Sequence, residues 1–140
     1  MIRKLYKDDV DKVTQIWLKA NTKAHNFIPE RYWIEQFHDL KEIIPQSEVY
    51  VYEKNGEILG FIGLSDNYIA GIFVSIISQS KGIGKQLLDY VKGIKTELSL
   101  SVYQKNKRAI KFYQRESFII QSENIDENTG EQDFLMVWER

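Results

Sequence analysis

An almost unbroken apolar run, YIAGIFVSII at Tyr68–Ile77, constrains the fold of this chain more than any other stretch. Continuous apolar residues without alternation are typical of a central strand that is covered on both faces. The run is followed by QSKGIGKQLLDYV (Gln79–Val91), in which two glycines precede apolar residues with the spacing of an amphipathic helix. A strand, a glycine turn and a helix in direct succession predict a sheet with a helix packed against it.

The remaining sequence shows patterns for further strands and helices. Strands are expected at Ile2–Leu5, Glu48–Glu53, Glu57–Leu64, Glu97–Tyr103, Phe118–Ile125 and about Gln132–Trp138, and helices at Asp8–Ala24, Pro29–Ile44, Ile83–Ile94 and Asn106–Arg115. Asn55-Gly56 is typical of a type I′ hairpin turn. The order βααβββαβαββ combines hairpins with helical crossovers, which predicts an α/β (α+β) fold with one mixed sheet and helices on both of its faces.

Composition limits the class of protein. A chain of 140 residues fits a single domain, 1–140, with enough buried surface for one core. It has no cysteine, which excludes disulfides, cysteine metal sites and cysteinyl intermediates. No segment resembles a secretion signal or a membrane span, so we expect a cytoplasmic protein without a membrane partner. A formal net charge of −1 gives no bulk attraction to nucleic acid, and no residue spacing indicates a metal site.

The turn at Gln79–Gly84 has the chemistry of an anion site. Backbone N–H groups at the start of a helix have no intrahelical acceptor and lie at the positive end of the helix dipole. Glycine allows the turn and lets an anion approach the backbone closely. The turn lacks the Lys-Ser/Thr pair of a P-loop, and Leu87 replaces the third glycine of the dinucleotide fingerprint. A strand-to-helix turn without a ligand is the alternative interpretation.

Two motifs carry a resemblance to a known family. Gln79-x-x-Gly82-x-Gly84, after an apolar strand, resembles the pyrophosphate loop of the GCN5-related N-acetyltransferases, which bind the diphosphate of coenzyme A. The segment NKRAIKFYQRESF is similar to that family's Asn-x-x-Ala-x-x-Phe-Tyr-x-x-x-Gly-Phe element. The matching positions are Asn106, Ala109, Phe112, Tyr113 and Phe118. Ser117 replaces the usual glycine, which puts the turn after this helix in doubt because serine adopts a left-handed conformation only with strain.

The resemblance implies a fold and a set of cofactor contacts. The sheet would be mostly antiparallel, with about seven strands, about four helices and a splay between the two central strands that holds the cofactor arm. Acetyl-CoA is the implied co-substrate. The implied cofactor-binding residues are Ile72, Phe73, Val74, Gln79, Ser80, Lys81, Gly82, Ile83, Gly84, Lys85, Asn106, Ala109 and Phe112. The backbone at Ile72–Val74 would pair with pantetheine like an added strand, and Asn106 is also predicted to cap its helix.

The resemblance further implies direct acetyl transfer to an amine in a ternary complex. Tyr113 would be the general acid that protonates the departing thiolate, which contributes about 10²–10⁴ in rate. A protonated amine must first lose its proton, so a general base is expected. Some relatives carry an acidic residue on the two central strands where this chain has serines. The weaker candidates for the base are His25, in the region that walls the acceptor pocket, Glu48 and His38.

The sequence leaves the partner and two other interpretations open. The acceptor is a small-molecule or peptide amine, and neither net charge nor aromatic content distinguishes a protein N-terminus, a lysine, a polyamine or an aminoglycoside. The oligomeric state is a monomer or a homodimer. A non-catalytic CoA-binding module of the same fold is one alternative. An α/β protein without any ligand is the other, and it requires both motifs to be accidental.

Overall fold

The computed structural model describes residues 1–140 and contains a seven-stranded sheet in the order β1-β2-β3-β4-β5-β7-β6. Neighbouring strands are antiparallel except for β4 and β5, which are parallel. The strands are β1 (Ile2–Lys4), β2 (Glu48–Lys54), β3 (Glu57–Ser65), β4 (Tyr68–Val74), β5 (Glu97–Tyr103), β6 (Ile119–Ile125) and β7 (Gln132–Glu139). The helices are α1 (Val10–Ala24), α2 (Glu30–Ile43), α3 (Ile83–Ile94) and α4 (Lys107–Arg115). The predicted fold class and order of elements are confirmed.

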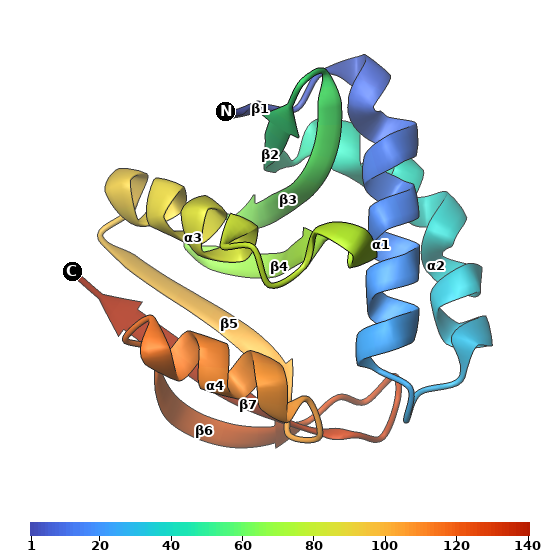
Figure 1. Ribbon diagram of the computed structural model, residues 1–140. Helices are drawn as coiled ribbons and strands as arrows, with labels where there is room; N and C mark the ends of the chain where they lie inside the picture. The colour runs from blue at the N-terminus through green and yellow to red at the C-terminus, as the bar shows by residue number, and fades with distance from the viewer.

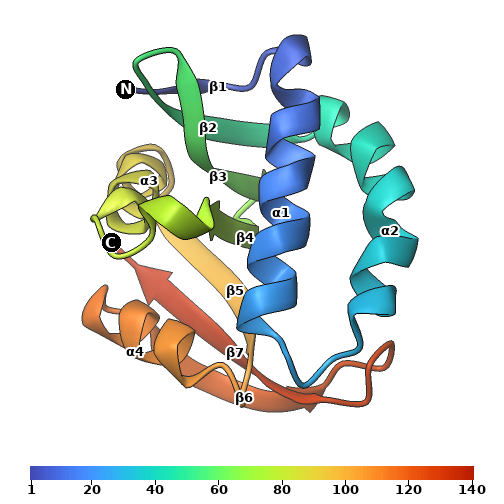
Figure 2. The same ribbon diagram turned by 45° about the vertical axis from the view of Figure 1, so that its right-hand side comes forward.

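Helices cover both faces of the sheet, as predicted. Helices α1 and α2 lie side by side on one face, and α3 and α4 lie on the other (Figure 1, Figure 2). Each layer has its own core: Val13 of α1 packs with Val51 of β2, whereas Leu87 of α3 packs with Leu100 of β5 and Met136 of β7. None of the helices combines the length and the apolar character that crossing a bilayer requires.

The apolar stripe of α3 explains how this helix packs. Ile83, Leu87 and Val91 recur at helical spacing and are at most 5% exposed, because they face the sheet. Tyr90 and Ile94 belong to the same predicted stripe, but they are 38% and 48% exposed. Tyr90 lies at the edge of the stripe, with its ring 5.0 Å from that of Tyr50, and Ile94 is the last residue of the helix.

Strand β4 departs from the prediction in length and in burial. The strand ends at Val74, and Ile76–Ser78 forms a 3₁₀ turn that leaves the Ile77 side chain 80% exposed. The expectation of a strand covered on both faces is wrong for most of its length, since Tyr68 and Ala70 are exposed, residues 71–74 are only partly buried and Ile69 alone is fully buried. The physical reason is the pairing with β5, which is limited to Tyr68 and Ile69. The apolar run therefore lines an opening instead of a sealed core.

The turn after α4 forms despite the serine. Ser117 adopts the left-handed conformation, with φ of 73°, in the place where the family has glycine. The Phe118 N–H donates to the Tyr113 carbonyl at 2.9 Å and the Ser117 N–H to the Gln114 carbonyl at 3.1 Å, which is the Schellman pattern. The rings of Tyr113 and Phe118 pack at a centroid distance of 5.7 Å. This cap fixes the end of the helix that carries Tyr113.

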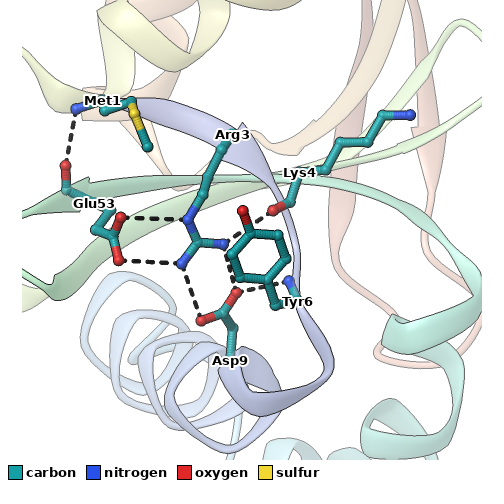
Figure 3. A network of polar contacts seen from close by, with 6 residues as sticks. All are labelled: Met1, Arg3, Lys4, Tyr6, Asp9 and Glu53. Carbon is teal, nitrogen blue, oxygen red and sulfur yellow. Dashed lines mark hydrogen bonds and ion pairs between the residues drawn. The ribbon is translucent and has the colours of Figure 1, made fainter.

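A compact ion cluster closes the N-terminal edge of the sheet (Figure 3). The guanidinium of Arg3 on β1 donates to both carboxylate oxygens of Asp9, at 2.8 and 3.2 Å, and to both of Glu53, at 3.4 and 3.2 Å. It also lies 4.0 Å from the ring centroid of Tyr6. The cluster joins β1 and β2 to the start of α1, on the side of the sheet away from the opening.

Candidate active site

A cavity of about 1000 Å³ opens where β4 and β5 separate. Its wall is built from α1, α2, β4, the loop before α3, β5 and α4, so both helical layers contribute to it. Ligand pockets usually measure roughly 300–1,000 Å³, which places this cavity at the upper end of the range. Every residue assigned to the cofactor or to catalysis lines it except Lys81, which is exposed. Two motifs that are distant in the sequence therefore meet in one place.

The separation of β4 from β5 leaves main-chain groups available in the cavity. The Ser75 N–H donates to the Leu59 carbonyl of β3 at 2.8 Å. Because main-chain groups alternate between the two sides of a strand, those of Phe73 also face β3, whereas those of Ile72 and Val74 face the opening. The Val74 carbonyl accepts a bond from Gln79 Nε2 at 3.1 Å. The opening thus offers a strand edge to a ligand, and Gln79 ties the glycine loop to it.

Strand β4 also contains an irregularity that sequence reasoning missed. The pairing with β3 shifts between Gly63 and Leu64, so that Gly71 and Ile69 have partners while Ala70 has none. Ala70 lies in the cavity wall. Such a bulge redirects main-chain groups next to a site. Its only signal in the sequence is a small residue inside the apolar run.

The loop before α3 presents a row of unused donors. The backbone N–H groups of residues 80–85 take part in no backbone or side-chain hydrogen bond. Ser80 and Gly82 are both left-handed, with φ of 64° and 83°, and this geometry turns the amides outward before the helix begins. Consecutive free N–H groups at a helix N-terminus form an anion site. The loop is open to the cavity and is not packed shut by neighbouring side chains.

The charged side chains near this loop differ from the prediction. Lys85 forms ion pairs with Asp89 at 2.9 Å and with Glu116 at 3.1 Å, so its charge is already balanced within the protein. Arg108 of α4, which sequence reasoning did not select, donates from Nη2 to Ser80 Oγ at 2.6 Å and lines the cavity. A guanidinium suits a phosphate better than a lysine because it offers two parallel donors.

Helix α4 places the second motif against the loop. Asn106 caps the helix, and its Oδ1 accepts the Ala109 N–H at 3.3 Å, as predicted. Phe112 is close enough to α3 that a Cβ built on Gly84 would lie 3.7 Å from its ring. Burial, with a smaller contribution from Tyr68, raises the pKa of Tyr113 well above its ordinary value. The phenol therefore keeps its proton at neutral pH, as a general acid must.

His25 is held firmly at the opposite wall. Its Nδ1 lies 3.1 Å from Asn21 Oδ1, and its Nε2 lies 3.1 Å from Asn106 Nδ2. The ring stacks on Trp33 at 5.5 Å and meets Tyr103 edge to face at 5.1 Å. Burial in this aromatic setting lowers the pKa of His25 to about 4, so the imidazole is neutral at physiological pH.

The other two base candidates lie outside the cavity wall. Glu48 accepts hydrogen bonds from the Tyr50 hydroxyl at 2.7 Å and from Lys95 at 3.1 Å, and these bonds lower the pKa of its carboxyl group. His38 is on the outer surface of α2, where its side chain is 84% exposed and lies 3.5 Å from Glu42. Neither residue is placed to receive a proton from a bound amine.

The end of the cavity beside His25 is acidic, which sequence reasoning missed. Tyr103 donates its hydroxyl proton to Asp126 Oδ2 at 2.6 Å, and Asp133 pairs with Tyr103 across the β5–β7 ladder. Burial and the neighbouring Asp126 raise the pKa of Asp133, whose carboxylate has no hydrogen-bond or ion-pair partner. The register of β5 and β7 brings these groups together, and that pairing is not visible in the local sequence.

The same end contains an unused buried donor. Trp33 is 6% exposed and lines the cavity, and its indole Nε1–H has no acceptor in the protein. Buried donors of this kind are rare in folded proteins and call for a partner. The cavity thus has an amide-rich end at residues 80–85 and an acidic end at Tyr103, Asp126 and Asp133, with Tyr113 also in its wall.

Comparison with known proteins identifies the family. The sequence model described as "Acetyltransferase (GNAT) family" matches residues 10–118. The peptidyl-lysine N-acetyltransferase YiaC of Escherichia coli K12 is 31% identical over 140 residues, which cover 99% of this chain and 96% of that protein. The solution structure of apo YjaB from Escherichia coli superposes with a TM-score of 0.87 at 19% identity, covering 99% of this chain and 96% of that one. The PaiA N-acetyltransferase of Thermoplasma acidophilum, solved with coenzyme A, has a TM-score of 0.85 at 18% identity, covering 100% and 98%.

The family match and the fold agree with the two motifs of the sequence. The profile spans both the loop at Gln79–Gly84 and the α4 segment, and the structural relatives share the whole arrangement of strands and helices. The resemblance inferred from these motifs is confirmed: this chain belongs to the acetyltransferase (GNAT) family and is an N-acetyltransferase.

Proposed function

We propose that this protein transfers the acetyl group of acetyl-CoA directly to the side-chain amine of a lysine in a peptide or protein. One observation carries the proposal. The free amides of residues 80–85 and the protonated phenol of Tyr113 line the same cavity, whose other end is acidic. The free amides suit a diphosphate, the phenol suits a thioester, and the acidic end suits a cationic amine.

The residues present fit the CoA part of the co-substrate. The amides of residues 80–85 and the guanidinium of Arg108 would hold the diphosphate. The strand edge at Ile72 and Val74 would pair with the amides of the pantetheine arm, as an added strand does. A known structure of the same fold, PaiA of Thermoplasma acidophilum, contains coenzyme A.

Tyr113 supplies the proton that the reaction needs on the leaving group. Acetyl-CoA provides the acetyl thioester; the acceptor nitrogen forms a bond to its carbonyl carbon, and the carbon–sulfur bond breaks. The phenol of Tyr113 donates its proton to the sulfur, so that the thiol leaves neutral. Its raised pKa ensures that the proton is present throughout the neutral range. The lysine ammonium loses one proton to the medium or to a base before it attacks, and the nitrogen loses a second proton as the amide forms, which balances the proton that Tyr113 regains from the medium after its transfer to the sulfur.

Two features of the cavity favour a lysine as acceptor. A lysine side chain is long, slender and positively charged before it reacts, and the partly buried carboxylates of Asp126 and Asp133 attract such a charge. The unused indole N–H of Trp33 can donate to a peptide carbonyl beside that lysine. YiaC and YjaB of Escherichia coli are both named peptidyl-lysine N-acetyltransferases.

The proposal is tested by measuring the free thiol released from acetyl-CoA in the presence of lysyl peptides, polyamines and aminoglycosides. We expect release with lysyl peptides. Tyr113→Phe should lower kcat by about 10²–10⁴ while the binding of CoA is kept, since only the proton donor is removed. Binding is checked by thermal unfolding, because CoA at 100 times its dissociation constant adds about 2.7 kcal/mol of stability.

The matched control is Tyr90→Phe, which removes a phenol that packs on Tyr50 outside the cavity wall. It should leave turnover unchanged. Equal turnover in the wild type and in Tyr113→Phe would contradict the role of Tyr113. Unfolding that does not respond to millimolar CoA would contradict the cofactor site itself.

A further inference from the structure

A single chain of hydrogen bonds connects α1 with α4 across the cavity wall. Asn21 Nδ2 donates to the Trp17 carbonyl at 2.9 Å, within α1. Asn21 Oδ1 then lies 3.1 Å from His25 Nδ1, and His25 Nε2 lies 3.1 Å from Asn106 Nδ2. Asn106 Oδ1 accepts the Ala109 N–H at 3.3 Å, within the first turn of α4. The histidine is the only link in this chain between the two helices.

The two asparagines determine which nitrogen of His25 carries the proton. The Oδ1 atom of Asn106 is occupied as the helix cap, so its Nδ2 faces the histidine, and an amide nitrogen can only donate. His25 Nε2 must therefore be the unprotonated acceptor. Nδ1 carries the hydrogen and donates it to Asn21 Oδ1, whose own Nδ2 is already used on Trp17. Each hydrogen bond in the series Asn21–His25–Asn106 therefore has a single donor and acceptor assignment.

We propose that His25 is a positioning residue, which holds the carboxamide of Asn106, and through it the start of α4, in the orientation that acetyl transfer requires. The inference rests on the proposed function. The lone pair of His25 Nε2 already accepts a hydrogen bond from Asn106, so His25 has no free acceptor for the proton of the incoming amine. The second hydrogen on Asn106 Nδ2 has no acceptor in the protein, and Asn106 lines the cavity. A substrate carbonyl can take that hydrogen only while His25 fixes the amide plane.

The surroundings of His25 favour a neutral ring in the neutral pH range. The side chains packed against it are Trp33 of α2, Phe27 of the loop between α1 and α2, and Tyr103 of β5. Tyr103 is the one titratable group among them, and its hydroxyl is bound to Asp126 instead of to the imidazole. A charged imidazole would lose its bond from Asn106, because both partners would then be donors.

A double-mutant cycle tests the coupling through acetyl-CoA kinetics. His25→Ala should raise KM for acetyl-CoA about tenfold, because it removes the hydrogen bond that orients Asn106. Asn106→Ala should raise KM at least as much, because it also removes the helix cap and the donor to the substrate. The double variant should be no worse than Asn106→Ala alone. His25→Gln is the conservative variant: its amide oxygen can accept from Asn106 but cannot take a proton in the neutral range. We expect His25→Gln to stay within about threefold of the wild type and to keep the pH profile of kcat/KM between pH 5.5 and 8.

Other outcomes would overturn the inference. Loss of activity in His25→Gln as large as in His25→Ala, together with loss of the acidic limb of the profile, would make His25 the base. Additive losses in the cycle, or no change in any variant, would show that the bond to Asn106 has no role. His38→Ala serves as the control for removing an exposed histidine and should change none of these values.

A measurement on the free protein separates this inference from the proposed function. Nitrogen-15 shifts of the His25 ring should show a hydrogen on Nδ1, none on Nε2, and no titration near pH 6.5. His25→Ala should shift the side-chain amide resonances of Asn106, whereas His38→Ala should not. The opposite tautomer would overturn the positioning role even if acetyl transfer is observed. The expected tautomer without any CoA binding would instead refute the proposed function alone.

Discussion

The N-terminal edge of the sheet and the loop before α3 treat their polar groups in opposite ways. At the edge, Arg3 donates to two carboxylates and to the Lys4 carbonyl and stacks on Tyr6, so that its donors are used within the protein (Figure 3). In the loop, the amides of residues 80–85 have no acceptor, although they are backbone groups that folding normally pairs. The Arg3 cluster uses its hydrogen-bonding groups within the fold, whereas the loop leaves its amides without a partner in the protein.

From this difference we expect substitutions in the Arg3 cluster to change stability and substitutions in the loop to change ligand binding. Removing a donor from a satisfied, partly buried cluster leaves carboxylates without a counter-charge, so it should lower stability and leave the distant cavity unchanged. A side chain that fills the space above the unpaired amides should weaken ligand binding and leave stability unchanged, because no contact within the protein depends on that space. Changes in the two regions therefore affect different measurable quantities.

The largest effect is expected for Arg3→Met, which keeps the length of the side chain and removes its charge. Asp9 and Glu53, with side chains 12% and 27% exposed, would face one another without the guanidinium. We expect the free energy of unfolding to fall by about 2–3 kcal/mol, less than the 3–5 kcal/mol of a fully buried pair. Urea unfolding measures this loss. The CoA affinity of the folded protein should stay the same.

The matched control is Lys12→Met, which removes an exposed ion pair of 4.0 Å to Glu57 and should change stability by about 0.5 kcal/mol at most. The pH dependence of stability also distinguishes the two variants. The hydrogen bond from Arg3 lowers the pKa of Asp9, so the stability it gives is present above the ordinary pKa of aspartate and is lost as the pH falls through the lowered value. Arg3→Met should lack this loss; an unchanged acid transition would contradict the assignment.

An effect of intermediate size is expected for Gly84→Ala in the amide-rich loop. A Cβ there would lie 3.7 Å from Phe112, an ordinary contact, so the free protein can accept it. Alanine favours a helix over glycine, and we expect the free energy of unfolding to stay equal or to rise by up to about 1 kcal/mol. The methyl group would stand between an anion and the amides, and the dissociation constant for CoA should rise at least about tenfold.

Gly93→Ala gives the control on the same helix. A Cβ at Gly93 meets nothing within 4 Å, and the residue is outside the cavity wall. It should gain similar helix stability without any change in CoA binding. Equal CoA affinity in both variants and the wild type would mean that the loop does not hold the diphosphate, and the contrast with the Arg3 cluster would lose its functional meaning.

How far the sequence predicted the structure depends on whether a feature is local. The order of elements, the turn at Asn55-Gly56, with φ of 54° and 78°, and the cap formed by Asn106 follow from residues close in sequence, and all are present. The loop at residues 79–84 was recognisable as a candidate anion site because glycine spacing and helix start are also local. Apolar periodicity, however, could not tell a sealed strand from one that lines an opening, so the end and the burial of β4 were predicted wrongly.

The missed parts of the site depend on contacts between distant segments. Asp133 faces Tyr103 only because β5 and β7 pair in one register, and a shift by one residue would turn its side chain to the other face. The bond between His25 and Asn106 joins residues 81 positions apart. Arg108 gains its importance from Ser80, whose left-handed backbone gave no signal in the sequence. Long-range register and backbone conformation decide these features.

The smallest effect is expected at Ser117, where the fold itself carries strain. Its φ of 73° is one that a side chain disfavours by about 1–2 kcal/mol, while glycine loses more entropy on folding by about 0.5–1 kcal/mol. Ser117→Gly should therefore raise the free energy of unfolding by about 0.5–1 kcal/mol. Ser65→Gly, on a strand without positive φ, should lower it by a similar amount. Because the Schellman bonds that hold Tyr113 use only backbone atoms, turnover should not change in Ser117→Gly. A loss of turnover would show that strain at Ser117 helps to place the phenol, and the division between groups for stability and groups for function would then fail at this turn.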